Sequence, residues 1–227
     1  MPRISIILPV YNEATNLPQT LPLLCQNPDL EVIVVDGGST DDSLAIAGSY
    51  GAKVFLSPES GRAHQMNAGA AIANGDILLF LHADTQLPVG FAAAVSKALA
   101  DETVVAGAFE LAIAGTEPGL RWIERGVRWR SRYCHLPYGD QALFLRRSTF
   151  AALGGFPTLP IMEDFILVRQ LRRQGKITIL PQPVRTSARR WQRLGVLKTT
   201  LINQVMILGY FAGVAPHHLA RWYRRLR

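Results

Sequence analysis

Short apolar runs rich in β-branched residues alternate with helix-like segments through roughly the first hundred residues of this chain, and this alternation limits the folds open to it. Five strands are expected, at residues 4–8, 31–35, 53–56, 77–81 and 104–111. Helices are expected between them, at residues 14–25, 41–50, 61–73 and 90–100. Strands separated by helices are typical of βαβ units. The pattern therefore predicts an α/β fold with a Rossmann-like, doubly wound, mostly parallel sheet flanked by helices.

The second of these helices carries a start signal. Ser39 or Thr40 can cap it, and Asp41 and Asp42 then fall in its first turn, where the helix dipole favours negative charge.

The alternation stops at residues 115–139, where five arginines stand among aromatic residues. We expect a helix and a loop there, at the mouth of a site. A strand at 141–145, a short helix after Ser148 and a helix at 165–174 complete the predicted fold.

The composition indicates one folded domain in a reducing compartment. The 227 residues are 48% hydrophobic and 18% charged, as in globular proteins, and they suffice for a single α/β core. Cys25 and Cys134 form no CxxC pair, which excludes a disulfide framework and a cysteine zinc site. The first apolar run meets Pro9 and Asn12 and is interpreted as a strand, not a signal peptide. We expect a cytoplasmic protein.

Charge is concentrated at the C-terminal end. The chain has a net charge of +7, and residues 165–227 contain 13 Lys plus Arg and no acid. Such a block attracts phosphate, in a nucleotide diphosphate, an anionic lipid surface or nucleic acid. An apolar stretch at 194–216 precedes the basic tail and suits a lipid surface better, so no nucleic acid partner is expected.

Three interpretations of the stretch at 194–216 stay open. It is an amphipathic helix that lies peripherally on the inner face of a membrane or contacts a second subunit in a homo-oligomer. Alternatively, it is a last helix that covers the protein's own core. A transmembrane span is disfavoured, because the longest apolar run is far below the roughly 18 residues that a spanning helix needs.

Polar residues follow the predicted strands directly. Pro9, Tyr11 and Glu13 come after the first strand, Asp36 after the second, and His82 and Asp84 after the fourth. In an open parallel sheet, ligands bind at the carboxyl ends of the strands. Singly, each residue could serve a turn, a helix cap or an ordinary loop; together they predict a ligand site at this edge.

Five separated motifs are similar to those of family 2 glycosyltransferases. They are PVYNE at 9–13, VVDGGSTDDS at 34–43, GRAHQMNAGAAIANGDILLFLHADT at 61–85, GGF at 154–156 and MED at 162–164. The resemblance covers roughly residues 3–191. It implies a GT-A fold over residues 1–191, a nucleotide-sugar donor and transfer with inversion, and it leaves 192–227 as a basic amphipathic C-terminal helix and tail.

The resemblance also implies roles for the residues that bind the nucleotide. Tyr11 and Asp36 match positions that hold the base, where a ring stacks on uracil and a carboxylate accepts its N–H. Pro9 and Glu13 fall in the same pocket. Arg62 matches a basic position that meets the diphosphate or the base, since a guanidinium binds two oxygens at once.

The metal motif departs from the family pattern. His82-Ala83-Asp84 stands where the family has DxD, so Asp84 is the one certain carboxylate ligand. One carboxylate with two phosphate oxygens suits Mg²⁺, whereas a ligating His82 nitrogen would favour Mn²⁺. Alternatively, His82 contacts no ion.

Glu163 and Asp164 match the acidic pair of the family, in which the second acid is the catalytic base. Both could equally cap the following helix. Residues 187–191, SARRW, resemble the QxxRW element of processive members without its Gln, which favours transfer of a single sugar. The resemblance assigns Arg190 and Trp191 to the diphosphate and acceptor, and Gly139, Asp140 and Gln141 to the acceptor side.

The predicted function is therefore an inverting glycosyltransferase that moves one sugar, from a UDP-sugar first of all, to a hydroxyl acceptor such as a lipid. A sugar nucleotidyltransferase or a dinucleotide dehydrogenase would need a glycine-rich loop after the first strand, where this chain has PVYNE. The alternative from another class is a catalytically impaired nucleotide-binding or scaffold protein, which His82 in the metal motif would explain.

Overall fold

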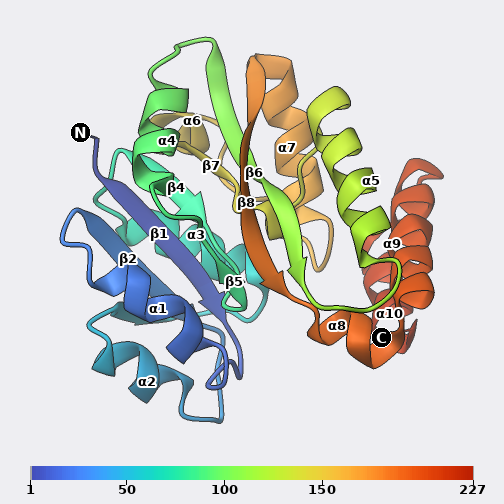
Figure 1. Ribbon diagram of the computed structural model, residues 1–227, viewed down its shortest axis with the longest axis horizontal. Helices are drawn as coiled ribbons and strands as arrows, with labels where there is room; N and C mark the ends of the chain where they lie inside the picture. Colours follow the sequence, from blue (N-terminus) through green and yellow to red (C-terminus); the bar gives the residue numbers. More distant parts are fainter. Residues whose placement is uncertain (1, 227) are drawn as a thin grey trace.

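The computed structural model describes residues 2–226, and an eight-stranded sheet runs through its centre (Figure 1). The strands are β1 (Ile4–Val10), β2 (Leu30–Asp36), β3 (Lys53–Leu56), β4 (Ile77–Phe80), β5 (Thr85–Gln86), β6 (Val104–Ala114), β7 (Phe144–Arg146) and β8 (Lys176–Ser187). Their spatial order is β3-β2-β1-β4-β7-β6-β8-β5. Strands β1 to β4 pair in parallel, as do β6 and β8, whereas β7 and β5 pair antiparallel to their neighbours. The mostly parallel α/β sheet expected from the sequence is thus present.

Helices cover both faces of this sheet. They are α1 (Leu17–Cys25), α2 (Ser43–Ser49), α3 (Arg62–Ile72), α4 (Phe91–Leu99), α5 (Leu120–Tyr133), α6 (Arg147–Ala152), α7 (Glu163–Gln174), α8 (Arg189–Leu194), α9 (Val196–Phe211) and α10 (Pro216–Leu226). Helices α1, α4 and α5 share one hydrophobic core, and α3, α6 and α7 share the other. Because side chains alternate along a strand, Ile6 and Leu8 of β1 enter the first core and Ile7 enters the second.

The expected start of the second helix is wrong. Helix α2 begins at Ser43, with Asp42 at its N-cap position, so Asp41 and Asp42 precede the first turn. The hydroxyl of Ser39 bonds to Asp36 instead, and Asp41 accepts hydrogen bonds from Ala14 N and from Ser43. Local capping signals were outweighed here by contacts between loops.

Three strands differ from the expected ones, and the shortest of them, β5, was not expected at all. Gln141 lies in a short 3-10 helix, Gly139–Gln141, and the strand β7 begins only at Phe144. Strand β8 was missed, because Pro181 and Pro183 argue against a central strand. It pairs with β6 through a register shift at these prolines, where a bulge accommodates residues that cannot donate to the ladder.

The C-terminal helices pack on the rest of the molecule. Helix α8 crosses the expected boundary between 191 and 192, and Met206 of α9 and Leu219 of α10 form a third core with Met162 and Phe165 at the start of α7. This segment therefore covers part of the protein's own core, which is the second of the three interpretations given above for residues 194–216. Within residues 2–226, no helix has the length and apolar character needed to cross a membrane.

Candidate active site

The loops that follow β1 and β2 are hydrogen-bonded to each other at the carboxyl ends of these strands. Asn12 N donates to Ser39 Oγ at 2.8 Å, and Thr40 N donates to Asn12 Oδ1 at 2.8 Å. Asn12 adopts a left-handed φ of 55°, which Asn tolerates better than most residues. Between these anchors the side chain of Tyr11 is 61% exposed. Its ring is therefore free to stack on a ligand at this edge.

Asp36, the last residue of β2, holds the second loop in place. Its buried carboxylate accepts hydrogen bonds from the backbone N–H groups of Gly38 and Ser39, at 2.8 and 2.9 Å, and from the Ser39 hydroxyl. Gly38 has a φ of 96°, a conformation that favours glycine. Asp36 thus forms a turn, which was the alternative to a role in ligand binding. It lies at the position where the family motif expects contact with the nucleobase.

An ion pair joins α3 to α7. Arg62 Nε donates to Glu163 Oε1 at 2.5 Å, and the side chain of Glu163 is only 3% exposed. Burial alone would lower the pKa of Arg62, but the carboxylates of Glu163 and Asp164 outweigh it and raise this pKa. Burial also raises the pKa of Glu163, against the opposing charge of Arg62. The guanidinium thus stays charged next to the acidic pair.

His82 lies on the other side of the same guanidinium, with its Nε2 3.4 Å from Arg62 Nη1. An arginine can only donate, so Nε2 is the acceptor in this contact. Burial and the charge of Arg62 lower the pKa of His82 to about 4, although Asp164 opposes the shift. The imidazole is therefore neutral near pH 7, and it adds no negative charge where the family has an acid.

Asp164 is held by two backbone N–H groups. Its Oδ2 accepts from Gly139 N at 2.7 Å and its Oδ1 accepts from Phe165 N at 2.7 Å. The residue before the acidic pair, Met162, has a left-handed φ of 72°, which is strained for a side chain of this kind. Strain of this sort is typical of functional sites, and here it occurs directly before the acidic pair.

One small enclosed cavity brings the predicted residues together. Pro9, Arg62, His82, Gly139 and Asp164 all line it, together with apolar side chains of the second core. These residues come from five separate segments of the chain. The structure thus places the predicted base beside one part of the predicted nucleotide pocket.

The three residues expected on the acceptor side differ in their surroundings. Gln141 is fully buried, and its amide bonds to Arg130 Nη2 and to Phe109 O, so it braces the fold. Asp140 has an Oδ1 that is buried without a hydrogen-bond partner among the described residues. Burial raises the pKa of Asp140, partly offset by Arg130. An unsatisfied buried oxygen beside Gly139 and Asp164 suits contact with a ligand hydroxyl.

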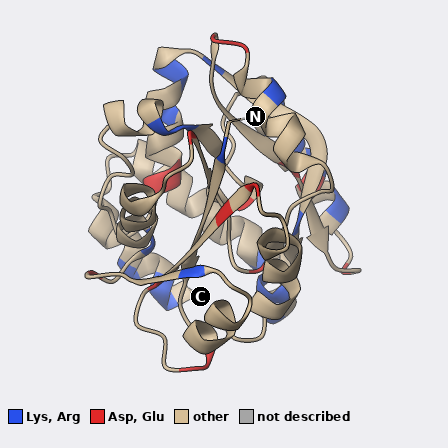
Figure 2. Cartoon of the chain, turned by 90° about the vertical axis from the view of Figure 1, so that its left-hand side faces the viewer, with Lys and Arg blue, Asp and Glu red and all other residues tan. Residues whose placement is uncertain are grey.

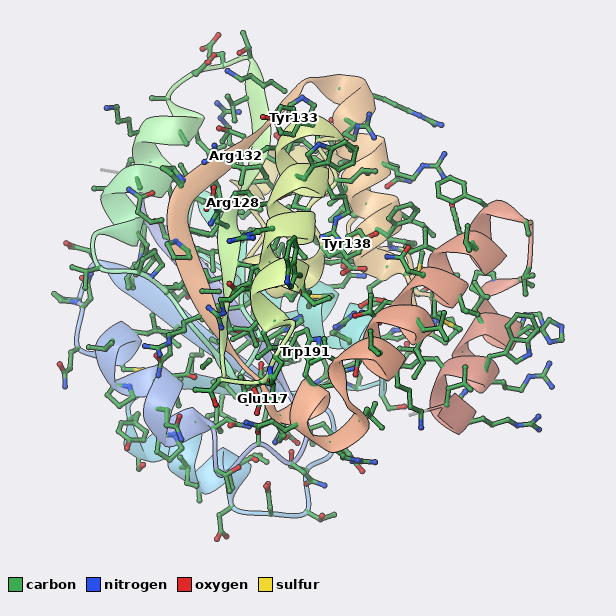
Figure 3. The ribbon with its side chains drawn as sticks, turned by 45° about the vertical axis from the view of Figure 1, so that its right-hand side comes forward. Glu117, Arg128, Arg132, Tyr133, Tyr138 and Trp191 are labelled. Atoms are coloured by element: carbon green, nitrogen blue, oxygen red, sulfur yellow. The ribbon has the colours of Figure 1, made fainter. Side chains whose placement is uncertain are left out.

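Arg190 and Trp191 are not among the residues that line this cavity. Arg190 Nη2 donates to Asn203 Oδ1 at 3.0 Å, and its guanidinium lies 5.0 Å from the ring of Tyr223. Trp191 packs against the first core, beside Glu117, which precedes α5 (Figure 3).

Sequence similarity decides the family. The family model described as "Glycosyl transferase family 2" matches residues 5–152. The chain belongs to this family. The matched residues contain the loops after β1, β2 and β4, and the acidic pair at 163–164 lies just beyond them.

Curated relatives of this family 2 glycosyltransferase carry transferase names. A "PGL/p-HBAD biosynthesis glycosyltransferase" of Mycobacterium bovis is 30% identical over 168 residues, which cover 68% of this chain and 63% of that protein. An "Undecaprenyl-phosphate 4-deoxy-4-formamido-L-arabinose transferase" of Sodalis glossinidius is 35% identical over 98 residues, covering 38% of this chain and 30% of that protein. The chain thus spans less than two thirds of the length of these relatives.

Solved structures confirm the GT-A fold of this family 2 glycosyltransferase. TarS 1-349 of S. aureus in complex with UDP has a TM-score of 0.67 and 18% identity, covering 82% of this chain and 60% of that one. The mannosyltransferase PcManGT of Pyrobaculum calidifontis, in complex with GDP-Man and Mn²⁺, has a TM-score of 0.61 and 24% identity, covering 99% of this chain and 72% of that one. At these identities the likeness concerns the fold alone.

The metal motif of this glycosyltransferase offers few ligands. Within residues 2–226 no three His, Cys, Asp or Glu side chains are grouped so that they could hold an ion by themselves. His82 Nε2 faces Arg62, so a cation there would meet another positive charge. A second acid, Glu13, lies near Asp84: burial and the charge of Glu13 raise the pKa of Asp84, and the charge of Arg189 opposes them. A cation shared between Asp84 and donor phosphates fits these residues.

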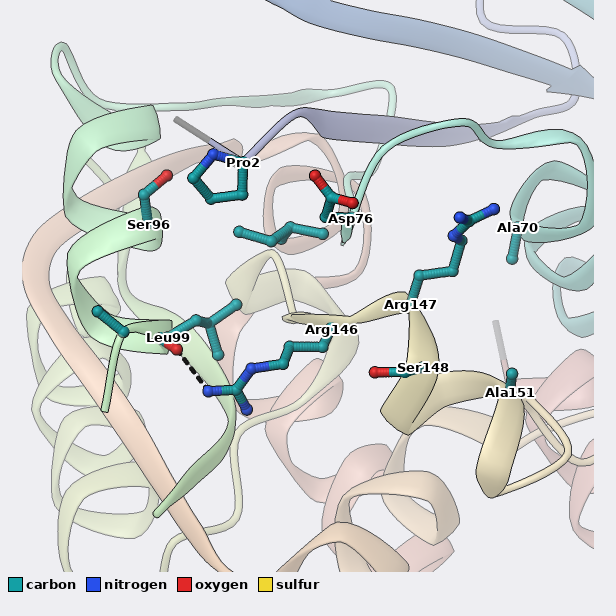
Figure 4. A pocket seen from close by; sticks show the side chains of 11 residues that line it. Pro2, Ala70, Asp76, Ser96, Leu99, Arg146, Arg147, Ser148 and Ala151 are labelled. Carbon is teal, nitrogen blue, oxygen red and sulfur yellow. Dashed lines mark hydrogen bonds between the residues drawn. The ribbon is translucent and has the colours of Figure 1, made fainter. Parts of the chain in front are cut away.

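A larger cavity lies elsewhere among the described residues. It has a volume of about 810 Å³ and is formed near the amino ends of β1 and β4, where Pro2, Asp76 and Leu99 line it (Figure 4). Arg146 reaches into it, but its guanidinium already donates to the carbonyl oxygens of Leu99, Asp101 and Val104. Ligands of open parallel sheets bind at the opposite edge, so we do not place the chemistry here.

Sequence reasoning missed the roles of two arginines. Arg130 stacks on the ring of Tyr138, 3.4 Å from its centroid, and holds Gln141. The arginine-rich segment 115–139 was a signal for it. Arg189 contacts Glu13. The family motif draws attention to its neighbour Arg190 instead.

Proposed function

We propose that this protein is an inverting glycosyltransferase that moves one sugar from a nucleotide-sugar donor to a hydroxyl acceptor. The observation that carries the proposal is the convergence of Pro9, Arg62, His82 and Asp164 on one cavity, at the edge where Tyr11 and Asp36 lie. Family membership supplies the class of reaction. The contacts of the individual side chains support the role that we propose for each residue.

Asp164 acts as the base. Its carboxylate accepts the proton of the acceptor hydroxyl while that oxygen attacks the anomeric carbon, and the bond from this carbon to the diphosphate breaks on the opposite side. The N–H groups of Gly139 and Phe165 fix the orientation of the carboxylate. A positioned base contributes about 10²–10⁴ in rate. Glu163, bound to Arg62, keeps that guanidinium next to the leaving group.

Tyr11 and Asp36 receive the base of the nucleotide, with Pro9 and Glu13 around it. Uracil is the base we propose, as a carboxylate at the end of β2 accepts its ring N–H and the exposed ring of Tyr11 stacks on it. Asp84 would hold Mg²⁺ or Mn²⁺ together with the diphosphate. The cation would supply stabilisation of charge on the leaving diphosphate.

A lipid acceptor at a membrane surface fits the C-terminal helices. Leu197, Leu201, Leu208 and Phe211 of α9 are 62–86% exposed, and no acid follows Asp164 in the sequence. Exposed apolar side chains next to basic ones are typical of helices that lie on anionic bilayers. The name of the Sodalis glossinidius relative includes a lipid phosphate. We therefore propose a peripheral position on the inner face of a membrane.

A scaffold that binds nucleotide without turnover is the second candidate, because neutral His82 replaces an acid of the metal motif. A screen of nucleotide sugars for release of free nucleotide, with Mn²⁺ and with EDTA, separates the two. We expect release from one donor, and an Asp164→Asn variant that binds this donor within about threefold but loses about 10²–10⁴ in rate. Binding without release from any donor would favour the scaffold.

A further inference from the structure

Three charged side chains from distant parts of the chain meet beside the metal motif. Glu13 follows β1, Asp84 follows β4, and Arg189 begins α8 directly after β8. Arg189 Nη2 lies 3.2 and 3.3 Å from the two carboxylate oxygens of Glu13. Ser187 N donates to Asp84 O at 3.0 Å, so the end of β8 is fastened to the metal motif as well.

Arg189 and Glu13 form an ion pair that is partly open to solvent. The side chain of Arg189 is 54% exposed and that of Glu13 is 21% exposed. Solvent screens an ion pair of this kind, so it is weak and easily exchanged for a better partner.

The following arginine has a different environment. Arg190 donates to Asn203 of α9 and lies over the ring of Tyr223 of α10. Arg189, in contrast, contacts Glu13 in the loop after β1. A guanidinium in this place matches two phosphate oxygens as well as two carboxylate oxygens.

We propose that Arg189 is an exchangeable counter-ion of the donor site. In the free protein it pairs with Glu13. When a nucleotide diphosphate binds, in the pocket of the proposed function on which this inference rests, Arg189 leaves Glu13 and pairs with the phosphates. The carboxylates of Glu13 and Asp84 would then hold a divalent cation, which would stabilise charge on the diphosphate. Arg189 is thus a positioning residue that competes with the cation before the donor arrives and acts with it afterwards.

This exchange predicts effects of opposite sign for one substitution. Without nucleotide, Arg189→Gln should bind Mn²⁺ roughly two- to fivefold more tightly than the wild type, because a competing charge is gone. With Mn²⁺ present, the same variant should bind UDP or GDP about tenfold more weakly, because a charged hydrogen bond to phosphate is lost. Simple loss of structure would weaken both.

The experiment measures Mn²⁺ by electron paramagnetic resonance and nucleotide by calorimetry on the full chain. Arg173→Gln, in the last turn of α7, changes the net charge equally and serves as the control. In a Glu13→Gln background, Arg189→Gln should no longer improve Mn²⁺ binding. An unchanged or weaker Mn²⁺ affinity of Arg189→Gln, or an equal gain in Arg173→Gln, would overturn the proposal.

These outcomes are separable from failure of the proposed function. The Mn²⁺ measurement needs no donor and no turnover, so it tests the exchange even if the donor screen finds no reaction. Normal turnover with an unaltered Mn²⁺ affinity in Arg189→Gln would contradict the counter-ion role of Arg189 but not the proposed transferase activity.

Discussion

Gly139 and Asp164 approach each other closely across the cavity. The N–H of Gly139 donates to Asp164 Oδ2, and a Cβ added at Gly139 would lie 2.9 Å from the same oxygen. Since this distance is shorter than real Cβ contacts, the carboxylate would have to move. Because Gly139 has no side chain, the carboxylate of Asp164, the proposed catalytic base, can occupy its position.

Gly139→Ala should reduce kcat about 10²-fold while the affinity for the donor nucleotide changes little, because a displacement near 1 Å of a reacting group costs about that much. Steady-state rates and calorimetry with the donor identified by the screen measure both quantities.

Gly126→Ala is the matched control, since Gly126 lies in α5 with no atom within 4 Å of an added Cβ. It should keep full activity and raise the free energy of unfolding by about 0.5–1 kcal/mol, as alanine is the better helix former. Equal rates in Gly139→Ala and the wild type would contradict the positioning of Asp164 by this contact.

The sequence predicted which residues gather at the site better than how they contact each other. Glu163 and Asp164 were recognised as a pair, but the partner of Glu163, Arg62, is 101 residues away, and no local pattern reveals such a contact. Asp36 was expected to contact the nucleobase, and its carboxylate also holds a turn. The direction of Arg190 depends on the rotation of α8 against α9, which only tertiary packing determines.

At the scale of elements, Glu31 ties three of them together at the amino ends of the parallel strands. Its carboxylate accepts from Ser5 Oγ of β1 at 2.5 Å and from Asn74 N and Nδ2 before β4, both at 2.7 Å. Burial would raise the pKa of Glu31, but the hydrogen bonds from Ser5 and Asn74 and the charge of Lys53 lower it overall.

Glu31→Gln should lower the free energy of unfolding near pH 7 by about 1–3 kcal/mol. The charged hydrogen bonds become neutral, and the amide NH₂ group of the glutamine would face a donor of Ser5 or Asn74 in place of an accepting oxygen. A lowered pKa in the folded state means that this stability exists above the ordinary value of 4.5 and is lost as the pH falls through the folded value. The difference from the wild type should thus shrink below pH 4.5. Urea titrations across this range measure it, and a constant difference would contradict the assignment.

The elements of the first half were predictable, because β1, β2 and β4 are buried runs and helices of ordinary length separate the strands. Strand β8 was not, since its prolines hide a strand whose ladder is broken by a bulge. The start of α2 moved because Ser39 bonds to Asp36 rather than to a helix. The first case depends on pairing with a distant strand and the second on a hydrogen bond within one loop.

At the scale of the whole molecule, basic and acidic residues both occur along the folded chain (Figure 2), but the acids end at Asp164 in the sequence. The charged side chains of helices α8 to α10 are therefore all basic, and the exposed side chains of α9 are those of Leu197, Leu201, Leu208 and Phe211 together with Lys198 and Gln204. This combination is what the proposed contact with an anionic bilayer requires.

The double variant Leu201→Glu and Leu208→Glu should release the protein from vesicles of phosphatidylglycerol and phosphatidylcholine, because it removes apolar contact and adds negative charge. Co-sedimentation measures this. The control is Leu23→Glu with Leu56→Glu, which lie on α1 and β3 and are 67% and 60% exposed. Equal release by both pairs, or equal retention, would contradict a contact through α9.

The separation of the site's parts along the chain has a consequence for biosynthesis. Glu13 and Arg189, which meet in the finished protein, are 176 residues apart, and Asp164 follows the first loop by nearly as much. At about 5–20 residues per second, a ribosome needs roughly 8–30 s to proceed from the first loop to the acidic pair. A nascent chain therefore contains the first loop well before Asp164 has been synthesised, so the proposed transfer of sugar must wait for the acidic pair.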